Sequence, residues 1–217
     1  MEQPIDHYWQ IRLAALKLKL EANNFQVHLA ADVAAAHRHV MHTIIPEIKP
    51  RSISWGGSMT FIASGLYDTL KFFPDVTAID TFDKRISAAE SLERRRRALL
   101  VDLFFTGTNA VTEQGQLVNL DMIGNRIGGI TFGPTHVVVL VGRNKIVPDV
   151  EAAMARIKNY VAPANAMRLD KKTPCTKTGR CEACKSPDRI CNTWTITEKA
   201  FPPGRVKIIL IDDALGL

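Results

Sequence analysis

Five consecutive apolar residues, Val137 to Val141 (VVVLV), constrain the fold of this chain more than any other feature. A continuous run of this kind predicts a strand that is buried on both faces, as in a parallel sheet covered by helices on each side. Val206 to Ile211 is a similar run, predicted to be a strand that closes the domain. Because helical patterns alternate with these strands, we expect one α/β domain over residues 1–217, built on an open, largely parallel sheet.

The helical patterns are amphipathic. Trp9, Leu13, Leu16 and Leu20 recur at helical spacing and predict a helix over Asp6 to Asn23. Further helices are expected from Asp32 to about Ile44, from Phe61 to Leu70, from Ser87 to Phe105, and from Pro148 to Val161. Short strands are expected at Phe25–Leu29, Ser52–Trp55, Val76–Asp80, Val111–Thr112, Leu117–Leu120 and Gly128–Thr131, with a hairpin turn at Gln114-Gly115.

Composition sets the class of protein. Apolar residues make up 46% and charged residues 23%, as in an ordinary globular domain, and no apolar run is long enough for a membrane span. The first ten residues do not resemble a secretory signal, so a cytoplasmic location is expected. The net charge of +6 lies largely in Arg94–Arg97 and Lys171–Arg189. Successive arginines on a helix point in different directions, so nucleic acid is an unlikely partner and a solvated or interface helix is favoured.

A turn-rich polar segment, Thr106 to Arg126, precedes the Val137–Val141 strand. Polar side chains between apolar strands must bond one another or a ligand, and ligands of open α/β sheets bind at the carboxyl ends of the strands. A second candidate is the strand–glycine turn–helix start at Ser52–Thr60, which suits an anion, although its glycines could equally form only a tight turn. We therefore expect a small organic acid or other anionic ligand to contact Gly56, Gly57, Ser58, Thr60, Gly107, Asn109, Asn119, Asp121, Asn125, Arg126 and Lys145.

Two of these polar residues carry specific expectations. Arg126 has the rigid fork that matches a carboxylate, but an internal ion pair with Asp121 or Glu113 is an open alternative. Glu113, beside the Gln114-Gly115 turn, is the candidate catalytic residue, as a general base or a nucleophile. Its carboxylate could equally bond nearby backbone N–H groups and only hold the turn.

All four cysteines fall within the expected Cys-rich insertion at 170–195, as Cys175-x5-Cys181-x2-Cys184-x6-Cys191. Four clustered thiols in a chain with no other cysteine favour metal ligation over disulfides. The spacing suits an iron–sulfur cluster, most simply [4Fe–4S], better than zinc, which typically uses paired C-x2-C knuckles. Zinc and a metal-free thiol loop remain alternatives.

Several motifs resemble the lactate-utilisation (LUD) domain family: GTNAVTEQG at 107–115, LVNLD at 117–121, GNR at 124–126, GP at 133–134 and GRNKIV at 142–147. The resemblance covers nearly the whole chain. It implies the α/β fold of CoA transferases and ribose-phosphate isomerases. It also implies a role in oxidising lactate to pyruvate beside iron–sulfur or flavin partner proteins. Gln114 departs from the usual threonine of the family.

The alternative is a free-standing transferase or isomerase acting on a CoA ester or sugar phosphate. Glu113 would then be catalytic and the cysteine loop structural. A homo-oligomer is compatible with either function.

Overall fold

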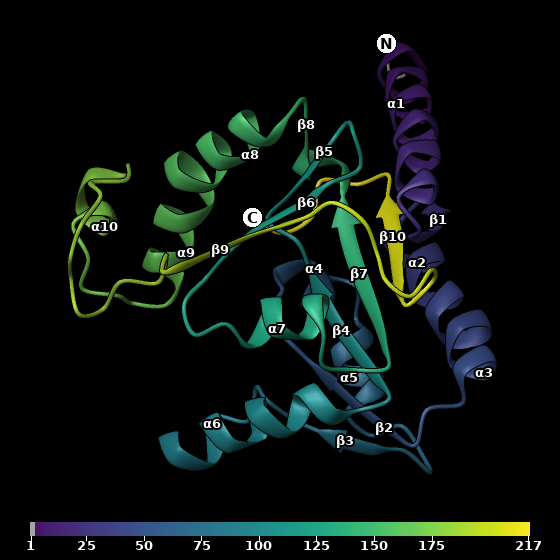
Figure 1. Ribbon diagram of the computed structural model, residues 1–217, viewed down its shortest axis with the longest axis horizontal. Coiled ribbons are helices and arrows are strands. Elements are labelled where there is room, and N and C mark those ends of the chain that lie inside the picture. Colours follow the sequence, from purple (N-terminus) through teal and green to yellow (C-terminus); the bar gives the residue numbers. More distant parts are fainter. Residues whose placement is uncertain (1–2) are drawn as a thin grey trace.

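The computed structural model describes residues 3–217 and contains two sheets (Figure 1). The larger sheet has six strands, all parallel, in the order β1-β10-β7-β4-β2-β3. Their bounds are Gln26–Ala30 (β1), Val206–Ile211 (β10), His136–Gly142 (β7), Leu103–Gly107 (β4), Ser52–Trp55 (β2) and Thr77–Ile79 (β3). The expected open, parallel α/β sheet flanked by helices is therefore confirmed.

The second sheet has four strands, in the order β8-β5-β6-β9. They span Ile146–Val147 (β8), Ala110–Thr112 (β5), Leu117–Asp121 (β6) and Thr193–Thr197 (β9). Since β5 starts three residues after β4 ends, and β8 four residues after β7 ends, the small sheet lies at the carboxyl edge of the large one. The expected β5–β6 hairpin is present, with its turn at Gln114-Gly115.

Helices cover both faces of the large sheet. One face packs against α1 (Gln3–Ala22), η2 (Ala98–Leu100) and α7 (Asn125–Thr131). The other packs against α2 (Val33–His39), the π-turn η1 (Val40–Ile44), α3 (Ile45–Ile48), α4 (Met59–Ala63) and α5 (Leu66–Leu70). The central strand β7 supplies both cores, with Val137, Val139 and Val141 on one face and Val138 and Leu140 on the other. This explains the unbroken apolar run.

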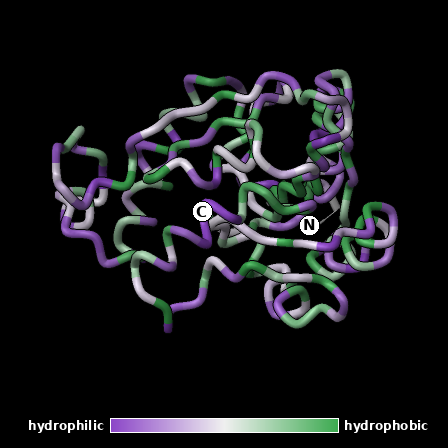
Figure 2. Tube along the Cα trace, turned by 60° about the horizontal axis from the view of Figure 1, so that its bottom comes forward, coloured by the Kyte–Doolittle hydropathy of each residue, from purple (hydrophilic) through white to green (hydrophobic). Residues whose placement is uncertain are grey.

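A third, smaller core joins the second sheet to α8 (Val150–Arg156) and η4 (Ile157–Val161), and the helical segment continues as α9 (Ala162–Arg168). The remaining helices are α6 (Ala88–Arg97), α10 (Cys175–Thr178) and the single turn η3 (Arg143–Lys145). Figure 2 shows the hydrophobic stretches concentrated in the body of the molecule, whereas the segment at its far left, which includes the cysteine loop, is mostly hydrophilic. None of the helices within residues 3–217 has the length and apolarity needed to cross a bilayer.

Two expected elements were wrong. The helix expected over Ser87–Phe105 ends at Leu100, and Leu103–Gly107 forms strand β4, next to β7 in the middle of the large sheet. Gly128–Thr131, expected as a strand, belongs to α7, where Gly129 lets the helix lie against the ring of Phe104. Both errors concern apolar segments whose partners are distant in the sequence, so local periodicity could not decide between helix and strand.

Smaller differences concern helix ends and two strands, β8 and β9, that the sequence did not predict. The helix expected over Phe61–Leu70 starts earlier, at Met59, and is broken at Ser64-Gly65 into α4 and α5. The helical segment expected to end at Val161 continues to Arg168. Strand β9 was not expected at all, because Thr193–Thr197 alternates weakly and lies at the edge of its sheet.

Candidate functional site

Thr108 and Asn109 form the centre of a polar cluster at the carboxyl edge of the large sheet. They connect β4 to β5, and both backbone carbonyls accept from cationic side chains. Lys145 Nζ lies 3.1 Å from the Thr108 carbonyl, and Arg156 Nη1 lies 2.8 Å from the Asn109 carbonyl. Arg126 reaches the Asn109 side chain. Three cations from three separate elements therefore converge on two residues.

Lys145 is buried, with 3% of its surface exposed, and no salt bridge connects it to a carboxylate within residues 3–217. Its ammonium donates to Thr60 Oγ1 (2.8 Å) and to the Thr108 carbonyl (3.1 Å). Burial, together with the nearby charges of Arg156 and Arg126, lowers the pKa of Lys145 to about 7. Because no carboxylate offsets its charge, the Lys145 ammonium loses its proton near neutral pH.

Arg126 is also buried, but its guanidinium is fully bonded. It donates to Asp121 Oδ1 (3.1 Å), Asn119 Oδ1 (2.9 Å), Asn109 Oδ1 (2.8 Å) and the carbonyls of Gly107 (3.4 Å) and Leu120 (3.1 Å). Since a guanidinium has five N–H groups, none is left for a ligand. The geometry thus matches the alternative in which Arg126 forms an internal ion pair with Asp121. Arg126 contributes positive charge to the cluster and holds its loops together, without a free N–H group for a ligand.

Asn119 supplies an unused donor. Its side-chain oxygen accepts from Thr108 Oγ1, from the Asn109 backbone N–H and from Arg126, whereas its buried Nδ2 has no hydrogen-bond partner among residues 3–217. A fully buried amide nitrogen without an acceptor is costly, so this group points to an absent acceptor.

The cluster contains more positive than negative charge. Within residues 3–217, the one carboxylate paired with any of Lys145, Arg126 and Arg156 is that of Asp121. Burial lowers the pKa of Arg156 as well, because its charge is poorly solvated. The arrangement is suited to a small anion such as a carboxylate.

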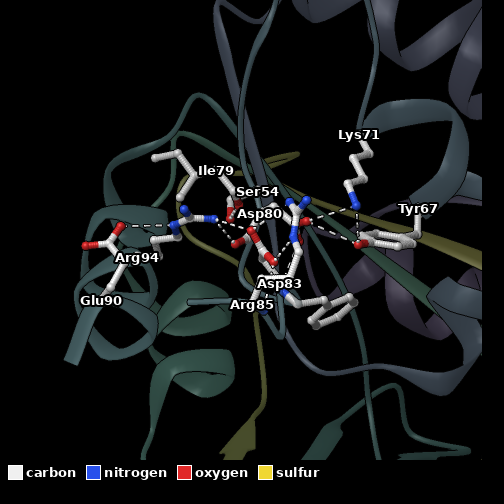
Figure 3. Close-up of polar contacts among 10 residues, drawn as sticks. Ser54, Tyr67, Lys71, Ile79, Asp80, Asp83, Arg85, Glu90 and Arg94 are labelled. Atoms are coloured by element: carbon white, nitrogen blue, oxygen red, sulfur yellow. Dashed lines mark hydrogen bonds and ion pairs between the residues drawn. The ribbon is translucent and has the colours of Figure 1, made fainter. Parts of the chain in front are cut away.

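A second polar network at the same edge provides a contrast (Figure 3). At the end of β3, Asp80 and Asp83 are paired with Lys71, Arg85 and Arg94, and Arg94 also bonds Glu90. Three cations thus meet three carboxylates, and Arg85 holds the pKa of Asp83 well below its usual range. This network is charge-balanced and closes the sheet edge. It also shows that Arg94, expected to be solvated or at an interface, folds back onto its own domain.

The glycine turn after β2 joins the site in part. Gly56 lies against the Arg126 side chain, and a Cβ there would lie 3.3 Å from Arg126 Cβ and 2.9 Å from the ring of Phe104. At Gly107 a Cβ would lie 2.5 Å from Ser58 Oγ, so both glycines permit close packing of loops. Ser58 caps α4 through the Phe61 N–H, whereas Gly57 faces open space. Asn125 begins α7 beside Arg126.

Glu113 lies apart from this cluster. Its carboxylate forms an ion pair with Arg12 of α1, and its backbone N–H donates to the Val147 carbonyl. The side chain is about half exposed, and within residues 3–217 it forms no hydrogen bond or ion pair with Lys145, Arg126 or the glycine turn. The geometry therefore gives no support to a catalytic role beside the other candidates.

Two contributors to the site were not expected from the sequence. Arg156 lies on α8 and donates to the Asn109 carbonyl. The sequence of this segment predicts a helix but does not indicate this distant contact. The segment Asp212–Leu217 passes over the cluster: the Leu215 carbonyl accepts from Thr60, and its N–H donates to Asn144. The only sequence signal for the second contributor was its position just after β10, a carboxyl strand end.

All four cysteines line one small surface pocket between α9 and the cysteine loop. They are free and partly exposed. Even so, within residues 3–217 no three His, Cys, Asp or Glu side chains are gathered tightly enough to hold a single metal ion. The thiols therefore share the wall of a pocket and not one coordination point.

The loop that carries the thiols is held by internal bonds. Arg189 donates to the carbonyls of Cys184 and Cys191, at 2.9 Å each. The Ala183 N–H lies 3.4 Å from Cys181 Sγ, and Thr173 Oγ1 lies 3.2 Å from Cys175 Sγ. These contacts hold the cysteine loop in one conformation.

Comparison with known proteins gives one family match. The model of the LUD domain family matches residues 13–211. Among solved structures, the chain is similar to a DUF162 family protein from Deinococcus radiodurans, at 13% identity and a TM-score of 0.47, over 94% of this chain and 98% of that chain. No curated protein matches.

Proposed function

Because the chain belongs to the LUD (lactate-utilisation) domain family, we propose that it is a component of a system that oxidises lactate to pyruvate. In this system it binds a small organic acid at the carboxyl edge of the large sheet. The observation that carries the proposal is the excess of buried positive charge around Thr108 and Asn109. Lactate and pyruvate each bring one carboxylate and one further oxygen.

The neighbouring groups define how such an acid would bind. Lys145 supplies a cation without a counter-charge, and Asn119 Nδ2 supplies a neutral N–H donor. Arg126 and Arg156 add positive potential in a region of low dielectric, where charge–charge interactions are strong. Arg126 meanwhile fixes the Asn119 carbonyl, so that the amide is presented in one orientation.

Titration calorimetry with lactate, pyruvate and inorganic phosphate tests this proposal. We expect a carboxylic acid to bind the full chain, and the Lys145→Met variant to bind it at least about 30-fold more weakly, since a charge-assisted hydrogen bond contributes about 2 kcal/mol or more. Lys84→Met, which removes an exposed lysine, is the matched control and should bind normally. Equal affinity of wild type and Lys145→Met would exclude Lys145 from the site.

The cysteine loop is proposed to hold an iron–sulfur cluster. Four thiols around one pocket provide the donor set, and a cubane needs its thiolates spread around a cluster, whereas zinc needs them about 2.3 Å from a single ion. Such a cluster supplies one-electron transfer to or from a flavin or iron–sulfur partner protein. Cys175, Cys181, Cys184 and Cys191 would hold it, with Arg189 fixing the loop.

The loop is physically connected to the proposed acid site. Asn192, next to Cys191, donates its backbone N–H to the Asp121 carbonyl, and the Asp121 carboxylate bonds Arg126. Strands β9 and β6 continue this connection by antiparallel pairing. This proximity supports one protein in which an organic acid and a redox centre are coupled.

Anaerobic purification tests the cluster. We expect a coloured protein with about four iron atoms and four sulfide ions per chain, and loss of both in the variant with all four cysteines changed to serine. Ser186→Ala, in the same loop, is the control and should keep its colour. A colourless wild-type chain containing about one zinc ion would instead establish the structural alternative.

A further inference from the structure

Helix α1 has two apolar stripes, only one of which faces its own domain. Leu13, Leu16 and Leu20 are buried in the core, and Trp9 packs against them. Ile5, Tyr8, Ile11 and Leu18 are exposed to between 51% and 68% of their surface. A surface helix normally has one apolar stripe and one polar face, so the second stripe lacks an internal explanation.

The exposed stripe has a regular heptad spacing. Tyr8, Ile11, Ala15, Leu18 and Ala22 follow one another at intervals of three and four residues, the pattern of a helix-pairing seam. Because this seam lies on nearly the opposite side from Leu13, Leu16 and Leu20, a second helix can pack on it without displacing the core. Figure 1 shows α1 at the margin of the molecule.

We propose that this stripe pairs with α1 of a second copy of the chain, antiparallel, to form a two-fold symmetric homodimer. In this arrangement Ile11 of one copy faces Ala15 of the other, and Tyr8 faces Leu18. Large side chains thus meet small ones or fill the gap beside them, as close packing requires. The contact is self-complementary, as a two-fold interface must be.

The charges on α1 favour the antiparallel direction. Asp6 lies in the first turn and Lys19 in the last. Antiparallel pairing places the Lys19 side chains of the two copies at opposite ends of the seam, and Glu21 of each copy near the positive end of the other copy's helix. A parallel pair would place Lys19 against Lys19 and align the two helix dipoles unfavourably. The distribution of charge therefore selects a second copy in one orientation.

Contacts within the domain also fix part of the exposed stripe of α1 before a second copy binds. Arg12 pairs with Glu113 and donates to the Tyr8 hydroxyl at 2.6 Å, and its guanidinium lies over the rings of Tyr8 and Trp9. Tyr8, the largest side chain of the seam, is thus fixed before association, which lowers the entropic cost of binding. Glu113, which the geometry leaves outside the acid site, supports this surface.

Sedimentation velocity over a range of concentrations tests the dimer and its direction. The full-length chain is expected to dimerise, and Ile11→Glu and Ala15→Lys are each expected to weaken association at least tenfold. The Ile11→Glu/Ala15→Lys double variant should recover association, because antiparallel pairing places each new glutamate against a new lysine. In a parallel pair like charges would face each other.

Circular dichroism must show that the single variants keep their helix content, and Phe132→Lys, at a residue that is 86% exposed elsewhere, should dimerise like the wild type. A wild-type chain that remains monomeric at high concentration, or a double variant that associates no better than the singles, overturns the proposal.

Discussion

Replacing Arg126 by methionine is expected to lower the free energy of unfolding by about 3–5 kcal/mol, the usual effect of removing one member of a buried ion pair. Five hydrogen bonds are lost together. The Asp121 carboxylate, the side-chain oxygens of Asn109 and Asn119, and two backbone carbonyls then lose a donor in a buried environment. Because these acceptors belong to β4, to β6 and to the connection between β4 and β5, the junction between the two sheets should loosen first.

Urea unfolding followed by circular dichroism measures this effect. Arg97→Met, at an exposed position on α6, is the matched control and should change stability by less than about 0.5 kcal/mol. Arg126→Lys should restore little of the lost stability, because an ammonium lacks the planar set of five N–H donors that a guanidinium offers. A loss below about 1 kcal/mol in Arg126→Met would show that the fork does not hold the sheets together.

The second large effect concerns the pH dependence of stability. The pKa of Lys145 is about 7 in the folded chain and near 10.5 when the lysine is exposed, so the unfolded chain binds more protons between these values. The free energy of unfolding should therefore rise with pH in that interval. The penalty is largest below pH 7 and disappears as pH approaches 10.5. The contribution of Lys145 should amount to roughly 2–3 kcal/mol between pH 7 and pH 9.5.

Lys145→Met isolates this contribution, because other groups titrate equally in both chains. The difference in unfolding free energy between wild type and variant should grow in favour of the wild type as pH rises. With Lys84→Met, which removes an exposed lysine, the corresponding difference should be flat. A flat difference for Lys145→Met as well would mean that Lys145 is solvated in solution.

Much of the fold could be predicted because its signals are local. The run Val137–Val141 required a strand buried on both faces, and it became the central strand β7 with a core on each side. Asp32 was expected to cap a helix and accepts from the Ala35 N–H. By contrast, Leu103–Gly107 and Gly128–Thr131 were assigned wrongly, because their state depends on β7 and Phe104, which are distant in sequence.

The site could be predicted in composition but not in detail. The rule that ligands bind at carboxyl strand ends selected Asn109, Asn119, Arg126 and Lys145, and the structure brings these residues together. It could not show that Arg126 is fully bonded within the protein. Nor could it show that Glu113, in the same motif, turns toward α1, because a hairpin reverses direction within a few residues.

The central claim is that the buried cations at the sheet edge bind a small organic acid, and proton uptake tests it most directly. The calorimetric titration with the bound acid should be repeated at pH 6 and pH 8 in buffers of different ionisation enthalpy. An anion stabilises the ammonium form of Lys145, so we predict uptake approaching one proton per acid at pH 8, almost none at pH 6, and weaker binding at pH 8. Binding that takes up no proton at pH 8 and keeps the same affinity at both pH values would contradict the account.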